Sequence, residues 1–358
     1  MEDPRRLRTR TGQDRPVCEQ AAPGLLTATA ARLERSRRVR PGPPAPRRRA
    51  SSPRPATDNQ TPRKATPMTT ISGKDRTVRY SELPNALVSA ANGVDYAYRD
   101  TGPGDGVPLV LLQHFRGNLD NWDPALIDAL AADRRVVTFD YAGVGGSSGE
   151  TAHSAEQMAQ ESIAFIEALD LGQVDLLGFS IGSFVAQQIA LTRPAIVRRV
   201  VLASAAPQGA EGMHGWAADV IGAIGAPQTS PEEYLDVFFA RSPASREAGR
   251  QALQRMYART EDRDAATTWA TRQAQYDAVC TWGTPDHAML QRLNCLQMPV
   301  FVANGDSDPM ILPHYSYLLA GLIPQARLKI YPASAHGFLF QHHAEFAADV
   351  RAFLGDAG

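Results

Sequence analysis

The chain has 358 residues, a hydrophobic fraction of 43% and a formal net charge of −1, which suits one or two domains with a large buried core. The near-neutral total conceals two parts of opposite charge, because residues 1–67 hold 16 Lys and Arg against 6 Asp and Glu, whereas residues 68–358 hold 21 against 32. The acidic second part argues against a surface for nucleic acid or an anionic membrane, and no apolar run has transmembrane length.

The first 67 residues are rich in Arg, Pro and Ala and contain no aromatic residue. Such a segment buries too little apolar surface to fold, so we predict a disordered basic extension. It could be an organelle transit peptide or a nucleic-acid-binding tail. The interpretation we favour is that translation starts at Met68, because the residues that follow lead directly into the first predicted strands.

From Met68 onward, short apolar runs alternate with segments of helical periodicity. The predicted strands are Leu87–Ala90, Val94–Arg99, Leu109–Gln113, Arg135–Phe139, Val174–Phe179, Arg199–Ala203, Val300–Asn304 and Arg327–Tyr331. The predicted helices between and after them are Pro124–Ala132, Ala155–Leu169, Ile181–Leu191, Leu312–Ala320 and Ala344–Leu354. This alternation predicts an α/β fold, with a mostly parallel eight-stranded sheet covered by helices on both faces. The first two strands are too close for a helical crossover, so we expect an antiparallel hairpin at one edge.

The alternation stops between about Pro207 and Met298, where no clear strand occurs and residues 231–240 and 246–260 have helical patterns. We therefore predict a helical insertion at 207–298, with the α/β core formed by 68–206 and 299–358. Ten large side chains of the insertion could line a pocket or form its own core; they are Met213, Trp216, Tyr234, Phe238, Phe239, Met256, Tyr257, Trp269, Tyr276 and Trp282.

One serine lies at a predicted strand–turn–helix junction. Ser180 follows the strand that ends at Phe179 and is flanked at two positions on either side by Gly178 and Gly182. Such a turn brings strand and helix so close together that only glycine fits beside the serine. The hydroxyl would then stand at a helix N-terminus, where amide groups favour developing negative charge. The pattern predicts that Ser180 is a nucleophile.

A second G-x-S-x-G sequence, at 145–149, centres on Ser147. Four residues separate it from the preceding strand, and the residues after it lack a helical period. We therefore interpret Ser147 as a loop residue.

Two further groups follow Ser180 in the order that a catalytic triad requires. Asp306 and Asp308 come just after the predicted strand 300–304, and His336 comes after the strand 327–331. Both positions lie at carboxyl ends of parallel strands, from which an acid and a histidine can converge on the serine. In such a triad, histidine takes the serine proton and the carboxylate orients the imidazole ring.

With these motifs the chain, over roughly 88–354, resembles the α/β-hydrolase superfamily. The resemblance implies the α/β-hydrolase fold, a helical cap at 207–298, and Asp308 as the acid, because it is the fourth residue of a G-x-x-D pattern. It also implies an oxyanion hole formed by the backbone amides of Phe115 and Ile181. Phe115 stands where the family usually has glycine after His114.

Other polar residues near these motifs have less specific interpretations. Arg116 could clamp an anionic substrate, although a solvated side chain or a pair with a cap carboxylate is the interpretation we favour. His114 is interpreted as a structural hydrogen-bonding residue. Cys18, Cys280 and Cys295 make no disulfide framework, and we interpret Cys280 and Cys295 as reduced residues of a cytoplasmic protein.

These features predict a serine hydrolase that cleaves a small or medium-sized carboxylic ester through an acyl-Ser180 intermediate, with no cofactor and no metal. The ester assignment depends partly on the resemblance, since this fold carries many chemistries. Alternatives are a C–C bond hydrolase, a lactonase, a cofactor-free haloperoxidase or perhydrolase, and a ligand receptor that retains the hydrolase pocket. The expected partner is a small-molecule ester, with no nucleic acid and no membrane; the oligomeric state is not predicted.

Overall fold

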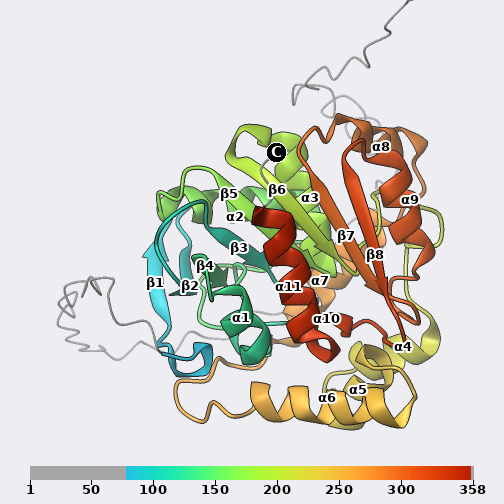
Figure 1. Cartoon of the computed structure of the whole chain (residues 1–358), viewed down its shortest axis with the longest axis horizontal. Coiled ribbons are helices and arrows are strands. Elements are labelled where there is room, and N and C mark those ends of the chain that lie inside the picture. Colours follow the sequence, from blue (N-terminus) through green and yellow to red (C-terminus); the bar gives the residue numbers. More distant parts are fainter. Residues whose placement is uncertain (1–77, 356–358) are drawn as a thin grey trace, which may run out of the picture. The chain divides into compact units, whose positions relative to one another are not determined.

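The computed structural model describes residues 78–355, so the predicted basic extension 1–67 lies outside the described residues. Within 78–355, eight strands form a sheet with the order β1-β2-β4-β3-β5-β6-β7-β8 (Figure 1). Their bounds are β1 Ala86–Ser89, β2 Asp95–Thr101, β3 Leu109–Leu112, β4 Val136–Phe139, β5 Val174–Phe179, β6 Val197–Ala203, β7 Val300–Gly305 and β8 Ala326–Tyr331.

The sheet is antiparallel at one edge and parallel elsewhere. β1 pairs antiparallel with β2, and β2 pairs antiparallel with β4. Every pair from β4 to β8 is parallel. The predicted eight-stranded, mostly parallel sheet and its edge hairpin are therefore confirmed.

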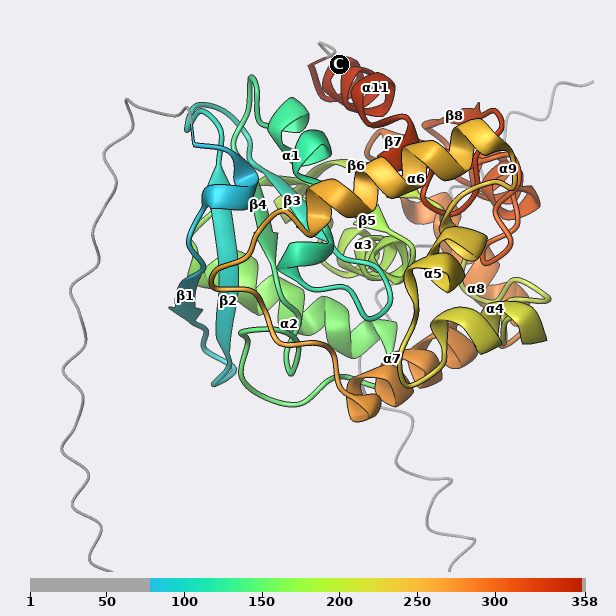
Figure 2. The same ribbon diagram turned by 90° about the horizontal axis from the view of Figure 1, so that it is seen from below.

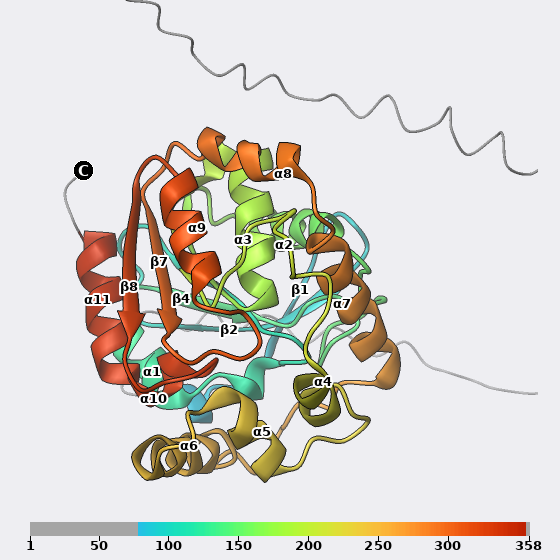
Figure 3. The ribbon, with the colours of Figure 1, turned by 90° about the vertical axis from the view of Figure 1, so that its right-hand side faces the viewer.

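Helices cover both faces of the sheet. In Figure 3, α1 and α11 lie on one side of the sheet, and α2, α3 and α9 lie on the other. Their bounds are α1 Pro124–Leu130, α2 Ala155–Ala168, α3 Ile181–Thr192, α9 His314–Leu322 and α11 His343–Gly355, with a short α10 at Phe338–Gln341. Because both faces are covered, every residue of β3, β4 and β5 is buried, as expected for central parallel strands.

The strand order creates a crevice where β3 and β5 lie side by side. The chain passes from β3 outward to β4 and then returns across the sheet to β5. The loops that follow β3 and β5 consequently diverge, and a crevice opens outside the carboxyl ends of these strands. The loop 113–118 directly follows β3, and Ser180 directly follows β5, so both lie at this crevice.

A helical segment joins β6 to β7, as the sequence predicts. It contains α4 Ala218–Ile224, α5 Pro231–Phe238, α6 Pro243–Met256, α7 Trp269–Trp282 and α8 His287–Gln291. The arrowheads of β7 and β8 point toward α4, α5 and α6 in Figure 3. Seen from below, α6, α5, α4 and α7 form an arc in front of the sheet (Figure 2). We call residues 204–299 the insertion; that 207–298 constitute a separate cap domain stays a prediction.

Two smaller expectations concern membranes and thiols. None of the helices within residues 78–355 is long and apolar enough to cross a membrane. Cys280 is a free thiol, whereas Cys295 is disulfide-bonded. The prediction that both cysteines are reduced is therefore wrong for Cys295.

Candidate active site

Ser180 is the one residue between the end of β5 and the start of α3. Its backbone is in a strained region, with φ 56° and ψ −123°, which few residues other than glycine adopt. A Cβ on Gly178 would lie 2.3 Å from the carbonyl oxygen of Gly182, and a Cβ on Gly182 would lie 2.0 Å from that of Leu112. Both glycines are therefore required by close backbone approach, and the predicted strand–turn–helix junction is confirmed.

Ser180 and His336 line the same cavity, which has a volume of about 580 Å³. Both residues are almost fully buried, and the Ser180 side chain makes no capping hydrogen bond to α3. Nε2 of His336 has no hydrogen-bond partner among the described residues, so the Ser–His hydrogen bond is not formed here. Such bonds are often long before substrate binds.

Asp308 contacts the other nitrogen of His336. Its Oδ2 lies 2.8 Å from Nδ1 of His336, and both side chains are inaccessible to solvent. Its Oδ1 accepts hydrogen bonds from the amides of Met310 and Ile311, at 2.9 and 3.0 Å. Since a carboxylate only accepts, Nδ1 of His336 carries the hydrogen and Nε2 presents its lone pair, which is the tautomer that a general base for serine needs.

Asp306 has a different role in the same turn. It is exposed, and its carboxylate accepts hydrogen bonds from the amides of Ala333 and Ser334, at 2.8 and 3.2 Å. Partial burial acts to raise the pKa of Asp306, but these hydrogen bonds and one from Ser307 outweigh it, so the pKa is lowered. Asp306 therefore joins the turn after β7 to the loop that carries His336.

Two buried residues that the sequence analysis did not single out also support this loop. Oγ of Ser204 lies 2.9 Å from Oδ1 of Asn304 and 3.1 Å from the carbonyl oxygen of His336. Asn304 in turn donates to the carbonyl of Ile311 at 2.9 Å. Ser204 has a positive φ of 47° directly after β6, but no local sequence pattern marks it, because its partners are distant in the chain.

The loop after β3 contributes the proposed oxyanion donor Phe115. Phe115 lines the cavity together with Ser180, and Ile181 begins α3 directly after the serine. Nδ1 of His114 lies 2.9 Å from the carbonyl oxygen of Phe115, so this nitrogen carries a hydrogen and donates it. Burial lowers the pKa of His114 to about 4, and the ring is therefore neutral. This agrees with the interpretation of His114 as a structural hydrogen-bonding residue.

Ser147 is fully engaged in a loop. Its hydroxyl donates to the carbonyl of Asp140 at 2.8 Å and accepts from the amide of Ala97 at 2.9 Å. It does not line the cavity that contains Ser180. The interpretation of Ser147 as a loop residue is confirmed.

Arg116 differs from what the sequence suggests. It is half-buried, and its guanidinium group donates to the carbonyls of Ile224, Ala226 and Pro227 in the insertion. No carboxylate within the described chain forms an ion pair with it. The favoured interpretation, a solvated side chain or one paired with a cap carboxylate, is therefore wrong, because backbone carbonyls supply the acceptors.

The cavity is lined by both large apolar and polar side chains. Four of the ten large insertion residues line it, namely Tyr234, Phe238, Met256 and Tyr257. Several of the others, including Met213, Phe239 and Trp282, are buried in the core. The polar residues of the lining include Asn118, Asp120, Arg263 and Asp264. A ligand that fills the cavity would accordingly have both apolar surface and polar groups.

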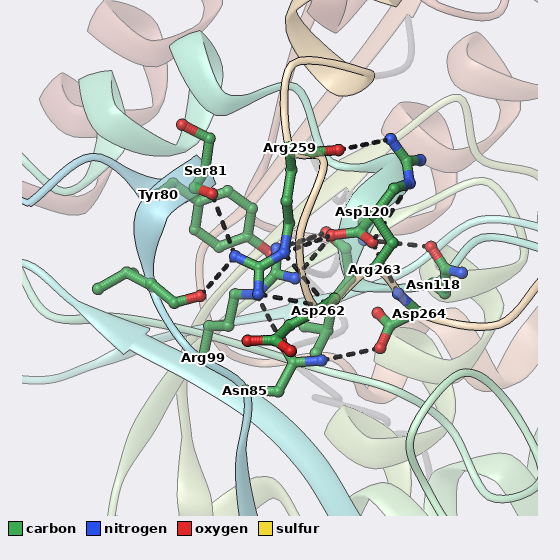
Figure 4. A network of polar contacts seen from close by, with 12 residues as sticks. Tyr80, Ser81, Asn85, Arg99, Asn118, Asp120, Arg259, Asp262, Arg263 and Asp264 are labelled. Carbon is green, nitrogen blue, oxygen red and sulfur yellow. Dashed lines mark hydrogen bonds and ion pairs between the residues drawn. The ribbon is translucent and has the colours of Figure 1, made fainter.

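These four polar residues belong to a network that joins the insertion to the core (Figure 4). Asp120 is buried and forms an ion pair with Arg99 at 2.6 Å, while Arg259 lies 3.7 Å away. The amide of Asp264 donates to Asp120 at 2.8 Å, and Asn85 donates to the Asp264 carboxylate at 2.8 Å. The connection between α6 and α7 is therefore held against the strands at the antiparallel edge.

Asp264 makes this network sensitive to pH. Burial, and then the charge of Asp120, raises the pKa of Asp264 above its usual 3.8, and burial and the charge of Asp264 raise that of Asp140. A carboxyl group whose pKa is higher in the folded than in the unfolded chain stabilises the fold while it is protonated. This contribution is complete below the pKa of the unfolded chain and is lost as the pH rises through the pKa of the folded protein. Ionisation of Asp264 therefore destabilises the native state at neutral pH.

We predict that Asp264→Asn raises the melting temperature at pH 8 by more than it does at pH 5, because Asn cannot ionise. Thermal unfolding of both proteins between pH 4 and pH 8 measures this difference. Asp262→Asn, an exposed change two residues away, is the matched control and should show no such trend. A difference that stays constant or shrinks as pH rises would contradict the prediction.

The family model of the alpha/beta hydrolase fold matches residues 107–343, and the chain belongs to this family. It is 28% identical over 284 residues, covering 75% of this chain and 98% of the relative, to a non-heme chloroperoxidase from Streptomyces lividans. It is 25% identical over 285 residues, covering 77% and 95%, to a 2-hydroxymuconate semialdehyde hydrolase from a Pseudomonas species.

Among solved structures, an alpha/beta hydrolase fold protein from Chitinophaga pinensis is similar over 78% of this chain and 100% of its own. The TM-score is 0.73 and the sequence identity 35%. The relatives with named activities include hydrolases and haloperoxidases, which supports an enzyme of this family.

Proposed function

We propose that this protein is a serine hydrolase that cleaves small or medium-sized carboxylic esters. The observation that carries the proposal is the arrangement of Ser180, His336 and Asp308. The serine stands on its strained turn in the same cavity as His336, and the buried Asp308 carboxylate holds the far side of the imidazole at 2.8 Å. A nucleophile, a base and an orienting acid are the parts that acyl transfer requires.

In this mechanism, Oγ of Ser180 attacks the ester carbonyl while Nε2 of His336 removes the hydroxyl proton. The carbonyl oxygen becomes an oxyanion, which accepts hydrogen bonds from the amides of Phe115 and Ile181. The imidazolium then gives its proton to the departing alcohol, leaving an acyl-Ser180 ester. Water, deprotonated by His336, attacks this ester and releases the carboxylic acid and the free serine.

The size and lining of the cavity support a substrate of modest size. A volume of about 580 Å³ is in the usual range for small-molecule sites. The side chains of Tyr234, Phe238 and Met256 would contact the apolar body of the substrate. The proposed partner is a small-molecule ester, and the proposed location is the cytoplasm.

A second candidate reaction is perhydrolysis, and the similarity to the non-heme chloroperoxidase favours it. Here hydrogen peroxide replaces water in the attack on acyl-Ser180, and the products are a peracid and the free serine. Both reactions share the acyl-enzyme, so they differ only in which molecule resolves it.

The test is a panel of p-nitrophenyl esters, from acetate to octanoate, and of simple lactones, with Ser180→Ala as the control. We expect steady-state hydrolysis that depends on Ser180 and is best for one of the shorter or medium chains. Peracid formation from acetate and hydrogen peroxide should be at least about tenfold slower than ester hydrolysis under matched conditions. This ratio corresponds to about 1.4 kcal/mol in activation free energy.

Three other results would contradict the proposal. Faster peracid formation would identify a perhydrolase. Turnover of lactones alone would identify a lactonase. A stoichiometric burst of p-nitrophenol with no steady state for any substrate would indicate a ligand receptor, since the acyl-enzyme would form without being resolved.

A further inference from the structure

The residue after Phe115 has a backbone conformation that its side chain does not favour. Arg116 has φ 60°, in the left-handed region where glycine, and sometimes Asn or Asp, is usual. The neighbouring position, Gly117, is a glycine, but it is the arginine that has the positive φ. A strained conformation persists only where surrounding contacts impose it, so the contacts of Arg116 decide how this loop is held.

The peptide unit between Phe115 and Arg116 is fixed at both ends. Its carbonyl oxygen accepts a hydrogen bond from Nδ1 of His114 at 2.9 Å. Its amide, the N–H of Arg116, donates to Oε1 of Gln275 at 2.6 Å. Gln275 lies on α7 and is completely buried. A helix of the insertion thus fixes the peptide plane that directly follows the proposed oxyanion donor.

The side chain of Arg116 makes a second connection to the insertion. Its guanidinium group lies 3.2 Å from the carbonyl oxygen of Ile224, 2.6 Å from that of Ala226 and 3.1 Å from that of Pro227. Arg272 donates to the carbonyl of Gly225 at 2.9 Å. Two arginines therefore bind four successive carbonyls, at 224–227, in the loop that follows α4.

Arg272 also connects this loop with α7. It stands one helical turn before Gln275, and its guanidinium group lies 4.9 Å from the ring centre of Trp269 and 4.7 Å from that of Tyr276. Within the described chain, neither arginine forms an ion pair with a carboxylate. The backbone acceptors of these two cations are thus the carbonyls of 224–227, and Arg272 also donates to Oε1 of Gln273 at 3.2 Å. Displacement of the loop would leave buried guanidinium N–H groups without these carbonyls, which is unfavourable.

We propose that Arg116 and Gln275 are positioning residues that couple the oxyanion loop to the insertion, so that the Phe115 amide is correctly placed only when α7 and the 224–227 loop are docked. This inference depends on the proposed function, because it assigns a consequence to the Phe115 amide in acyl transfer. Docking of the insertion would then complete the catalytic site as well as cover it. The amide of Phe115 remains the catalytic group, and Arg116 and Gln275 act through it.

Gln275→Met tests the coupling through the backbone. Methionine is similar in length and suits a helix, but it cannot accept the hydrogen bond from the Arg116 amide. For the best p-nitrophenyl ester we expect kcat to fall by about tenfold or more with KM within about twofold, since a misplaced oxyanion donor affects the transition state more than substrate binding. Gln275→Glu keeps an acceptor at this position and should recover part of kcat.

Gln251→Met is the matched control. Gln251 is an exposed residue of α6, another helix of the insertion, and its side chain donates to Glu247 at 3.1 Å. This variant should leave both kinetic parameters unchanged. A normal kcat in Gln275→Met would overturn the proposal. A loss of kcat accompanied by an equal rise in KM and a lower melting temperature would also overturn it, since a merely structural role produces that pattern.

Hydrogen exchange provides a readout that needs no turnover. In Arg116→Met, the amides of both 113–118 and 224–228 should exchange faster than in the wild type, because the two loops lose their shared contacts. Faster exchange in only one of the loops would refute the coupling even in an active esterase. Wild-type protein without ester turnover would instead refute the proposed function, while the exchange result would still decide whether the loops are coupled.

Discussion

Replacement of Ser180 by alanine should reduce kcat by about 10⁴-fold or more. Ser180 stands alone between β5 and α3 with φ 56°, and Gly178 and Gly182 fit this turn only because they lack side chains. The reaction that we propose begins with attack by this hydroxyl, and no other group on the turn can replace it. Since the members of a triad act as a unit, loss of the nucleophile removes the contributions of His336 and Asp308 as well.

Steady-state kinetics and covalent labelling measure this effect. A fluorophosphonate probe should label Ser180 alone, and peptide mapping would locate the adduct. Ser147→Ala is the matched control, because Ser147 is the centre of the other G-x-S-x-G sequence and its hydroxyl holds a loop. It should keep kcat within about tenfold of the wild type. Label on Ser147, or label that persists in Ser180→Ala, would disprove the assignment of the nucleophile.

Asp308→Asn should reduce kcat by about 10³- to 10⁴-fold. The carboxylate accepts at both oxygens, from Nδ1 of His336 and from the amides of Met310 and Ile311. An asparagine side chain has one acceptor and one donor. If its amide nitrogen faces His336, the imidazole must present a bare Nδ1 and lose the tautomer needed for catalysis. If it faces the two backbone amides, donors oppose donors and the turn is displaced.

Asp306→Asn is the comparison, because the two aspartates share one turn and differ in their partners. The carboxylate of Asp306 accepts hydrogen bonds from the amides of Ala333 and Ser334 and does not contact His336. We expect a much smaller loss of kcat and a lower melting temperature, since the turn loses charge-assisted hydrogen bonds. Measurement of kcat for the two variants on one ester ranks the two residues. The reverse ranking would identify Asp306 as the catalytic acid.

Residues whose role is set by neighbours in the chain were predictable from the sequence. The spacing of Gly178, Ser180 and Gly182 predicts a tight turn because the steric requirement is local, and the structure confirms the turn. The alternation of apolar runs and helical periods predicts the sheet for a similar reason. The acid of the triad could be predicted only in part. The sequence restricts it to Asp306 or Asp308, and the resemblance favours Asp308, which is the one that contacts His336.

Helix α7 illustrates why other features were not predictable. Its buried residues include Arg272 and Gln275, so the apolar period that identifies a helix is interrupted. Both polar groups tolerate burial because they have partners far away in the chain, the carbonyl of Gly225 and the amide of Arg116. A periodicity argument counts such residues as exposed, since a buried polar group is unfavourable without a hydrogen bond.

The sequence by itself determined the α/β class, the edge hairpin, the position of the insertion and the turn that carries Ser180, because each depends on periodicity or on local backbone sterics. Only the tertiary structure decided that Asp308 contacts His336 and that Arg116 binds carbonyls of the insertion. It also decided that Ser204 and Asn304 support the loops that carry His336 and Asp308. The contacts of Asp308, Ser204 and Arg116 join residues from 28 to 132 positions apart in the chain, and the folding of the sheet and its insertion is what brings them together. Local pattern carries no information about which distant donor will meet which acceptor.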